Sequence, residues 1–190
     1  MQKTGQGHVR IIAGSLRGSK LPVPGLQGLR PTSDRARETL FNWLQNGIAG
    51  RKTLDLFAGS GALGFEAVSR GAGPVVLVER NPEAVLGLQA SKQRLNTENL
   101  TVVQADALAW LPLQTGQGFE LVFLDPPFAG DIWPGLWPLL TPVLADIATL
   151  YIELPVDREL VLPVAMRLLK QGNTRQSRQM LLRWQKPVIG

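Results

Sequence analysis

The sequence predicts an α/β protein built on a mainly parallel sheet with helices on both faces. From residue 53 onward, short apolar runs alternate with helix-like patterns, the order that parallel strands and crossover helices produce. Carboxylates and a glycine-rich turn also follow directly after those runs, where the carboxyl ends of parallel strands place ligands. We therefore expect a core domain at 53–190, preceded by an extension at 1–52.

The N-terminal extension is expected to contain a hairpin and a helix that pack on the same core. Two short runs at 9–12 and 19–23 flank a glycine-containing turn, which predicts a small hairpin. The stretch 32–44 has an apolar face with helical spacing, and Thr32 or Ser33 can cap its first turn. That face consists of Ala36, Leu40, Phe41 and Leu44.

The core domain contains strand and helix patterns in alternation. Apolar runs predict strands at 53–57, 74–79, 100–104, 119–124 and 149–154, with weaker strands at 165–170 and 179–184. Helices are expected at 61–70, 82–95 and 133–144. Pro82 suits the first turn of its helix, whereas prolines interrupt the last one.

Composition excludes several kinds of chemistry. The chain has no cysteine, and its one histidine is His8, so disulfides, a thiolate nucleophile, a zinc cluster and a histidine triad are ruled out. We expect no metal. No apolar run approaches the ~20 residues of a membrane span, and the first ten residues lack the apolar core of a secretory signal. We therefore expect a cytoplasmic protein with no membrane partner.

The net charge of +5 is unevenly distributed along the chain. Residues 1–52 hold nine Lys/Arg against two acids, 53–163 have a balance of −8, and 164–190 have a balance of +6. Basic segments clustered in this way favour a polyanion bound with salt-dependent affinity, although a solubilising surface is the alternative. The candidate nucleic-acid contacts are Arg10, Arg17, Lys20, Arg30 and Arg35.

A glycine-rich turn, Asp55-Leu-Phe-Ala-Gly-Ser-Gly61, joins the first core strand to its helix. Gly59 and Gly61 carry no Cβ, so a ligand can approach the backbone closely. Glu79 ends the next strand about 20 residues on, where an acid can accept both hydroxyls of a ribose. Asp106 follows the third strand, where it can accept from an adenine amino group or cap a helix. The turn therefore predicts a cofactor that contains adenosine.

Charge favours one such cofactor over another. A nicotinamide dinucleotide places its phosphates at a helix N-terminus with positive surroundings. Here we expect four carboxylates and no base near the turn, namely Glu66, Glu79, Asp106 and Asp125. They suit the sulfonium and ammonium groups of S-adenosylmethionine, which we predict as the cofactor.

The segment Asp125-Pro-Pro-Phe128 ends the strand at 119–124. The Asp125 carboxylate and the Pro126 carbonyl can each accept one N–H of an exocyclic amine, and Phe128 can stack on the ring. The prolines fix φ and hold that carbonyl outward. A simple strand-ending turn is the structural alternative. Combined with the glycine-rich turn, the segment predicts methyl transfer to the amino nitrogen of a nucleobase.

The chain resembles the bacterial RsmD family over nearly its whole length. The most specific segment is Leu29-Arg-Pro-Thr-Ser-Asp-Arg-Ala-Arg-Glu-Thr-Leu-Phe-Asn-Trp-Leu44, supported by 10–14, 54–64 and 123–128. The resemblance implies guanine-N2 methylation of small-subunit ribosomal RNA, with S-adenosylmethionine as the donor. It also implies a seven-stranded Rossmann-like sheet of the class I methyltransferases and a guanine flipped into the Asp125 slot. The stretch 144–149 departs from the pattern, because it lacks the expected glycine turn.

Two further hypotheses remain open. Methylation of adenine N6 in DNA would use the same slot, and a non-catalytic RNA-binding assembly factor could retain the same fold. Under the leading hypothesis the partner is small-subunit ribosomal RNA, within an assembling or assembled subunit, and the protein acts as a monomer.

Overall fold

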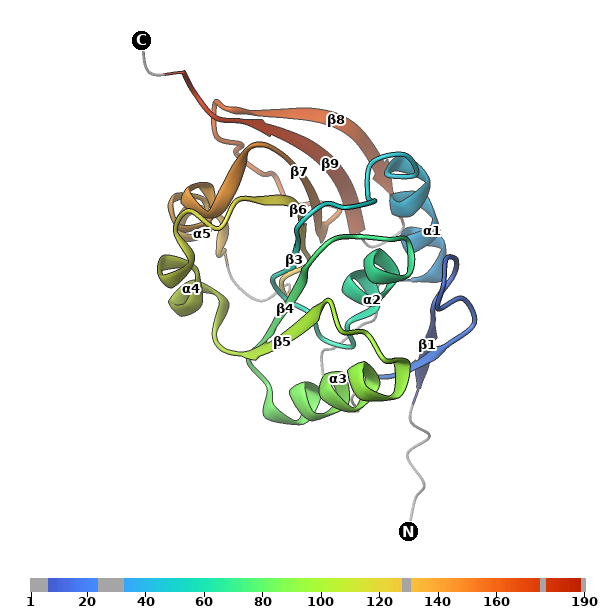
Figure 1. The fold of residues 1–190 in the computed structure, drawn as a ribbon. Helices are drawn as coiled ribbons and strands as arrows, with labels where there is room; N and C mark the ends of the chain where they lie inside the picture. Colours follow the sequence, from blue (N-terminus) through green and yellow to red (C-terminus); the bar gives the residue numbers. More distant parts are fainter. Residues whose placement is uncertain (1–6, 24–32, 128–130, 175–176, 189–190) are drawn as a thin grey trace.

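A seven-stranded sheet forms the centre of the protein (Figure 1). The structure is a computed structural model that describes residues 7–23, 33–127, 131–174 and 177–188. In chain order the strands of this sheet are β3 (Thr53–Asp55), β4 (Val75–Glu79), β5 (Leu100–Gln104), β6 (Phe119–Leu124), β7 (Leu144–Pro155), β8 (Met166–Asn173) and β9 (Ser177–Gln185). The first five pair in parallel, and β9 pairs antiparallel with both β7 and β8. The predicted fold class is confirmed.

The order of strands across the sheet is β5-β4-β3-β6-β7-β9-β8. The chain moves outward from β3 through β4 to β5 and then returns to place β6 on the other side of β3. The strand order therefore reverses between β3 and β6, which is the usual position of a ligand site in such a sheet. The carboxyl ends of β3, β4 and β6 lie along the same C-terminal side of the sheet, called the ligand edge below, and carry Asp55, Glu79 and Asp125.

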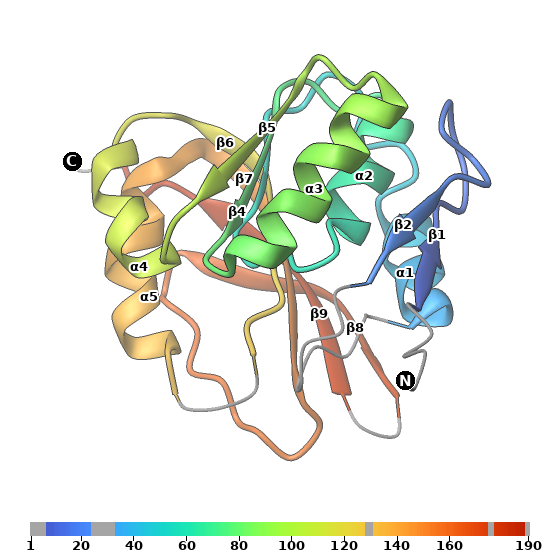
Figure 2. The ribbon, with the colours of Figure 1, turned by 90° about the horizontal axis from the view of Figure 1, so that it is seen from below.

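Helices cover both faces of the sheet (Figure 2). The helices are α1 (Asp34–Trp43), α2 (Ala62–Ser69), α3 (Pro82–Leu95), α4 (Ala107–Trp110) and α5 (Trp133–Leu140). Buried side chains of the first three pack with Phe123 and Tyr151 on one face. Those of α4 and α5 pack with Val122 and Leu124 on the other. Neighbouring residues of β6 thus face opposite layers, as the period of two in a strand requires.

The N-terminal extension packs on the face that α2 covers. Its strands β1 (His8–Arg10) and β2 (Lys20–Pro22) form an antiparallel two-stranded sheet. The helix α1 begins after Ser33, whose side chain accepts a 3.2 Å hydrogen bond from the Ala36 N–H. The rings of Phe41 and Phe123 meet edge to face with centroids 6.0 Å apart. The expected hairpin and capped helix are both present.

The predicted helix at 133–144 is too long. The α-helix ends at Leu140, a 3₁₀ turn covers Thr141–Val143, and Leu144 already begins β7. Pro142 has no N–H to continue a helical ladder. The strand expected at 149–154 is accordingly longer, because β7 pairs with β9 from Ile147 to Pro155. A continuous strand occupies the place where a glycine turn was expected.

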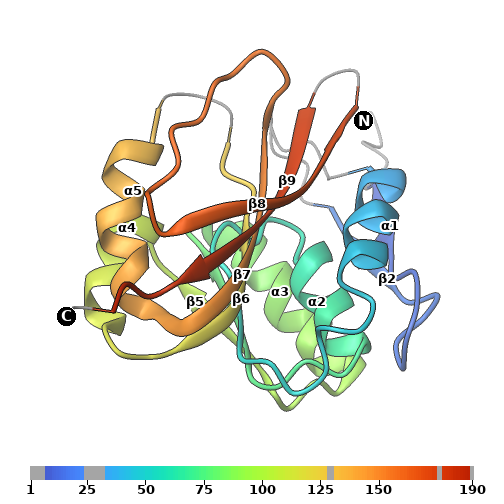
Figure 3. The ribbon, with the colours of Figure 1, turned by 90° about the horizontal axis from the view of Figure 1, so that it is seen from above.

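The last strands lie at one edge of the sheet, next to α1 (Figure 3). Among the described residues, the outermost strand, β8, pairs only with β9, and its register shifts between Leu168 and Lys170. This shift marks a β-bulge, which bends the strand and interrupts its ladder. Within the described residues, no helix combines the length and hydrophobicity needed to cross a membrane.

Candidate active site

The glycine-rich turn is shaped by two residues with left-handed backbone angles. Gly59 has φ of +52° and Gly61 has φ of +76°, a region that favours glycine. A Cβ on Gly61 would lie 2.6 Å from Leu88 Cδ2 and 2.8 Å from Phe65 Cδ2. Gly61 is therefore needed for the close packing of α2 on α3. The Gly59 N–H instead points to a side chain, because it donates a 2.9 Å hydrogen bond to Glu79 Oε2.

Glu79 ends β4 and holds the turn in place. Its other oxygen, Oε1, accepts a 2.8 Å hydrogen bond from the Asn81 N–H, and the side chain is half-buried. Each carboxylate oxygen has a second lone pair for a further donor. None of the ion pairs found within the described residues involves Glu79. The geometry fits a carboxylate that accepts hydrogen bonds from hydroxyl groups.

Asp55 is buried beneath the same turn. It is 2% exposed, and its Oδ2 accepts a 3.0 Å hydrogen bond from the Gly64 N–H in the first turn of α2. Burial raises the pKa of Asp55 to about 7, against the opposing effect of the Gly64 hydrogen bond, and the Glu79 charge raises it further. An amide that could bind a phosphate is thus already occupied by a carboxylate. This arrangement favours a cationic ligand over a dinucleotide.

Asp106 caps the short helix α4. Its Oδ1 accepts hydrogen bonds from the N–H groups of Leu108 and Ala109, at 3.0 and 3.1 Å. The capping alternative is therefore correct. The side chain is also exposed and follows β5 at the ligand edge of the sheet, where a carboxylate can still meet an adenine amino group.

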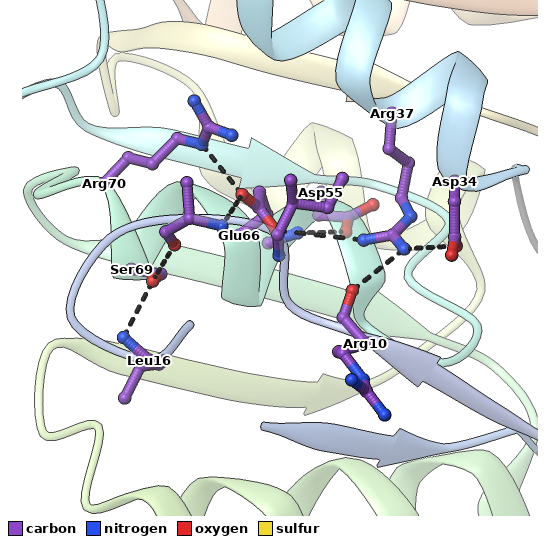
Figure 4. A network of polar contacts seen from close by, with 11 residues as sticks. Arg10, Leu16, Asp34, Arg37, Asp55, Glu66, Ser69 and Arg70 are labelled. Atoms are coloured by element: carbon purple, nitrogen blue, oxygen red, sulfur yellow. Dashed lines mark hydrogen bonds and ion pairs between the residues drawn. The ribbon is translucent and has the colours of Figure 1, made fainter. Parts of the chain in front are cut away.

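Glu66 does not belong with the carboxylates of the ligand edge. It is fully buried on α2 and accepts hydrogen bonds from the Ile12 and Ala13 N–H groups and from Arg70 Nε, at 2.7, 3.1 and 2.8 Å. Arg37 Nη1 lies 3.8 Å from its Oε2. Figure 4 shows these contacts between the extension and α2. The expectation of four carboxylates around the cofactor is wrong for Glu66, whose charge is compensated by Arg37 and Arg70.

Arg37 and Ser69 complete this polar network. The fully buried Arg37 donates to Asp34 Oδ1 and to the Arg10 carbonyl oxygen, at 2.7 and 2.9 Å. Ser69 Oγ accepts a 2.9 Å hydrogen bond from the Leu16 N–H. Arg37 was not identified from the sequence. A cation between apolar residues on a helix face would have indicated a buried acidic partner. The network attaches the hairpin to the helix that follows the glycine-rich turn.

The Asp125 segment leaves β6 at the same edge. Asp125 is half-buried, Pro126 is buried and Pro127 is exposed, whereas Phe128 lies outside the described residues. A small recess opens beside the two prolines. Its lining includes Ile132, Trp133, Glu153 and Arg158. A recess therefore lies next to the Asp125 segment.

Two residues beneath Asp125 were not identified from the sequence. Tyr151 and Glu153 lie on β7, and the Tyr151 hydroxyl donates a 3.1 Å hydrogen bond to Glu153 Oε2. Burial, followed by the charges of Glu153 and Asp125, raises the pKa of Tyr151 well above its ordinary value. Tyr151 therefore stays protonated and acts as a donor. The available signal was an acid within an otherwise apolar strand, Leu150-Tyr-Ile-Glu-Leu154.

The candidate nucleic-acid contacts lie on the extension. Arg10 ends β1, Lys20 begins β2, and Arg17 lies in the turn between them; all three are exposed. Arg35 is exposed on α1, whereas Arg30 lies outside the described residues. The hairpin is also linked to α3, because Arg94 Nη2 donates to the Lys20 carbonyl oxygen at 2.5 Å.

The family model described as "Conserved hypothetical protein 95" matches residues 9–183. The chain belongs to this family. Among its relatives is "Ribosomal RNA small subunit methyltransferase D" of Escherichia coli (strain K12), which is 45% identical over 159 residues, covering 83% of this chain and 80% of that protein. The resemblance to the RsmD family is thereby confirmed, and the chain is a methyltransferase.

Solved structures agree with this family assignment. The yhhF protein from Escherichia coli has a TM-score of 0.86 and 40% identity, and the match covers 95% of this chain and 100% of that one. The protein SMU.776, solved complexed with SAH, has a TM-score of 0.74 at 15% identity, covering 96% of this chain and 57% of that one. The second likeness shows only that this chain shares its fold with that protein.

Proposed function

We propose that this protein transfers a methyl group from S-adenosylmethionine to the exocyclic N2 of a guanine in small-subunit ribosomal RNA. The observation that carries the proposal is the position of Asp125-Pro126. This pair leaves β6 beside β3, at the reversal of strand order, with the Gly59–Glu79 contact at the neighbouring strand ends. The name of the Escherichia coli relative supports the RNA substrate.

The donor would be held by the residues at the ends of β3, β4 and β5. Glu79 would accept the ribose hydroxyls, Asp106 the adenine amino group, and the backbone at Gly59 and Gly61 would lie against the ligand. Asp55 would hold the first turn of α2 in place below the turn, through its hydrogen bond from the Gly64 N–H. When bound, S-adenosylmethionine supplies a methyl group on a sulfonium and leaves as the neutral thioether.

Asp125 and Pro126 would prepare the nucleophile. The N2 lone pair of guanine is delocalised into the ring, so the amine is a poor nucleophile. A carboxylate that accepts one N–H and a carbonyl that accepts the other favour a tetrahedral nitrogen whose lone pair points at the methyl carbon. Once the N–C bond has formed, the nitrogen is cationic and acidic, and Asp125 or water can take its proton. Phe128 would stack on the base, and alignment supplies most of the rate.

The extension would bind the RNA around the target. This proposal includes the division between the extension and the core at residue 52. It also includes phosphate contacts by five basic residues, Arg10, Arg17, Lys20, Arg30 and Arg35. We further propose that the protein acts as a monomer in the cytoplasm, on an assembling or assembled small subunit.

Replacing Asp125 with Ala tests the proposal directly. We expect methyl transfer to small subunits to fall by at least about 100-fold, a usual scale for losing a group that handles a proton, while calorimetry shows nearly unchanged donor affinity. Asp131→Ala removes an exposed acid six residues further on and should keep full activity. Unchanged turnover in Asp125→Ala would remove Asp125 from the chemistry.

The product identifies the acceptor. Small subunits and DNA are each offered with labelled donor, and the modified nucleoside is identified by mass. N2-methylguanosine from RNA is expected. N6-methyladenosine from DNA would support the alternative enzyme, and a failure to bind donor at all would support the non-catalytic assembly factor.

A further inference from the structure

We propose that Glu153 recognises the N1–H of the target guanine and thereby selects guanine over adenine. This inference rests on the proposed function, because it assigns the base specificity of the same slot. It adds a specificity-determining residue on β7 to the Asp125-Pro126 pair on β6.

The register of the sheet places Glu153 next to Asp125. In the parallel pairing of β6 with β7, Phe123 is opposite Tyr151 and Leu124 is opposite Ile152. The next position along both strands brings Asp125 and Glu153 together. Because side chains alternate between faces, both acids lie on the face occupied by Phe123 and Tyr151. Neighbouring strands are about 4.8 Å apart, so the two carboxylates can meet adjacent atoms of one small ring.

Glu153 is buried but directed into the pocket. It is 7% exposed, and it lines the recess beside Pro126. One carboxylate oxygen, Oε2, accepts the hydrogen bond from Tyr151. No donor among the described residues reaches the other oxygen, Oε1, and none of the ion pairs found there involves Glu153. Oε1 therefore remains accessible from the recess to a donor that a ligand supplies.

Guanine has two neighbouring hydrogen-bond donors that match the positions of the two acids. Its N2 amine and its N1–H are neighbours on the Watson–Crick edge, through which flipped bases are recognised. With N2 at Asp125, N1–H would meet Glu153 Oε1. Adenine with its amine at Asp125 would present the lone pair of N1 to the same oxygen, and the two acceptors would repel each other. Tyr151, which stays protonated, fixes the Glu153 carboxylate in the acceptor role.

The test changes the Watson–Crick edge of the base and one group of the side chain. The modified guanine is first located with wild-type protein, and small subunits are then reconstituted with 2-aminopurine at that position. This base keeps the 2-amine, but it has a lone pair at N1 and a hydrogen in place of O6. The missing O6 is the same for every protein variant, so a change in the ratio between variants reports on N1. We compare the rates of methyl transfer to guanine and to 2-aminopurine for wild type, Glu153→Gln and Glu159→Gln. Glu159 is exposed a few residues away, so its variant is a control for the charge change.

Wild type and Glu159→Gln should prefer guanine by at least about 100-fold, because a site built around one hydrogen bond strongly rejects an analogue that cannot make it. Glu153→Gln can donate from its amide to the 2-aminopurine N1, so its preference should shrink by at least about 10-fold. If Glu153 had a purely structural role, Glu153→Gln would slow methyl transfer to both bases equally. An unchanged ratio of the two rates would therefore overturn the inference. If wild type methylates neither base, the proposed function itself fails, and this inference fails with it.

Discussion

At the scale of single residues, Asp55 makes stability depend on pH. Its pKa is about 7 in the folded protein and about 3.9 in an unfolded chain. Between these values the native state binds a proton that the unfolded state has released, so the free energy of unfolding falls as the pH rises from about 4 to about 7. The stabilisation is complete below the lower value and is lost through the upper one. Asp55→Asn keeps an acceptor for the Gly64 N–H and should remove this dependence.

The size of the effect follows from the pKa difference. About three pKa units correspond to on the order of 4 kcal/mol. Urea unfolding of wild type and Asp55→Asn between about pH 4 and pH 8 measures this difference. Asp157→Asn, at an exposed position, should retain the wild-type slope. Parallel pH profiles for wild type and Asp55→Asn would mean that Asp55 is ionised in the native protein.

Individual site residues could be predicted to very different degrees. Glu79 and Asp125 were predicted at strand ends and Gly59 in the turn after a strand, because the alternation of strands and helices carries that information. The role of Glu66 depends on contacts with Arg37 and with Ile12, 54 residues away, and a local pattern cannot reveal such pairing. Even so, a single acid within the apolar helix Ala62-Leu-Gly-Phe-Glu-Ala-Val-Ser69 was a sign of a buried partner.

At the scale of elements, Glu66 joins the hairpin to α2. Glu66→Ala would remove the acceptor of the Ile12 and Ala13 N–H groups and the buried one of the two acids that pair with Arg37, leaving it with Asp34. Breaking a buried ion pair in this way costs about 3–5 kcal/mol. We expect that loss in urea unfolding, together with faster hydrogen exchange at Ile12 and Ala13. Exposed Glu38→Ala on α1 is the control, and equal effects of the two variants would contradict the assignment.

Elements with local signals were predicted most accurately. The bounds of α3 are as expected, since the Asn81 side chain accepts from the Glu83 and Ala84 N–H groups and Asn96 ends the helix with φ of +51°. The boundary between α5 and β7 was misplaced, because the start of β7 is determined by pairing with distant strands. Those partners are not visible in the segment itself.

At the scale of the whole molecule, positive charge lies at both ends of the chain. Reversing Arg17, Lys20 and Arg35 to Glu should weaken RNA binding and reduce the slope of log affinity against log salt by about 0.7–0.9 for each phosphate that the protein no longer neutralises. Filter binding over a salt series measures both. Reversal of Arg167, Lys170 and Arg183, exposed on β8 and β9, is the matched control. Equal reductions in affinity would mean that total charge, and not the hairpin and α1, determines binding.

The β-bulge in β8 has a consequence for how copies of this protein meet in a crowded cell. An outermost strand offers unpaired backbone groups to which another chain can add, and this is a common route to aggregation. The interruption between Leu168 and Lys170, with the cationic Arg167 beside it, opposes such pairing through both shape and repulsion. The bend and the charges along β8 thus favour separate molecules over stacked sheets.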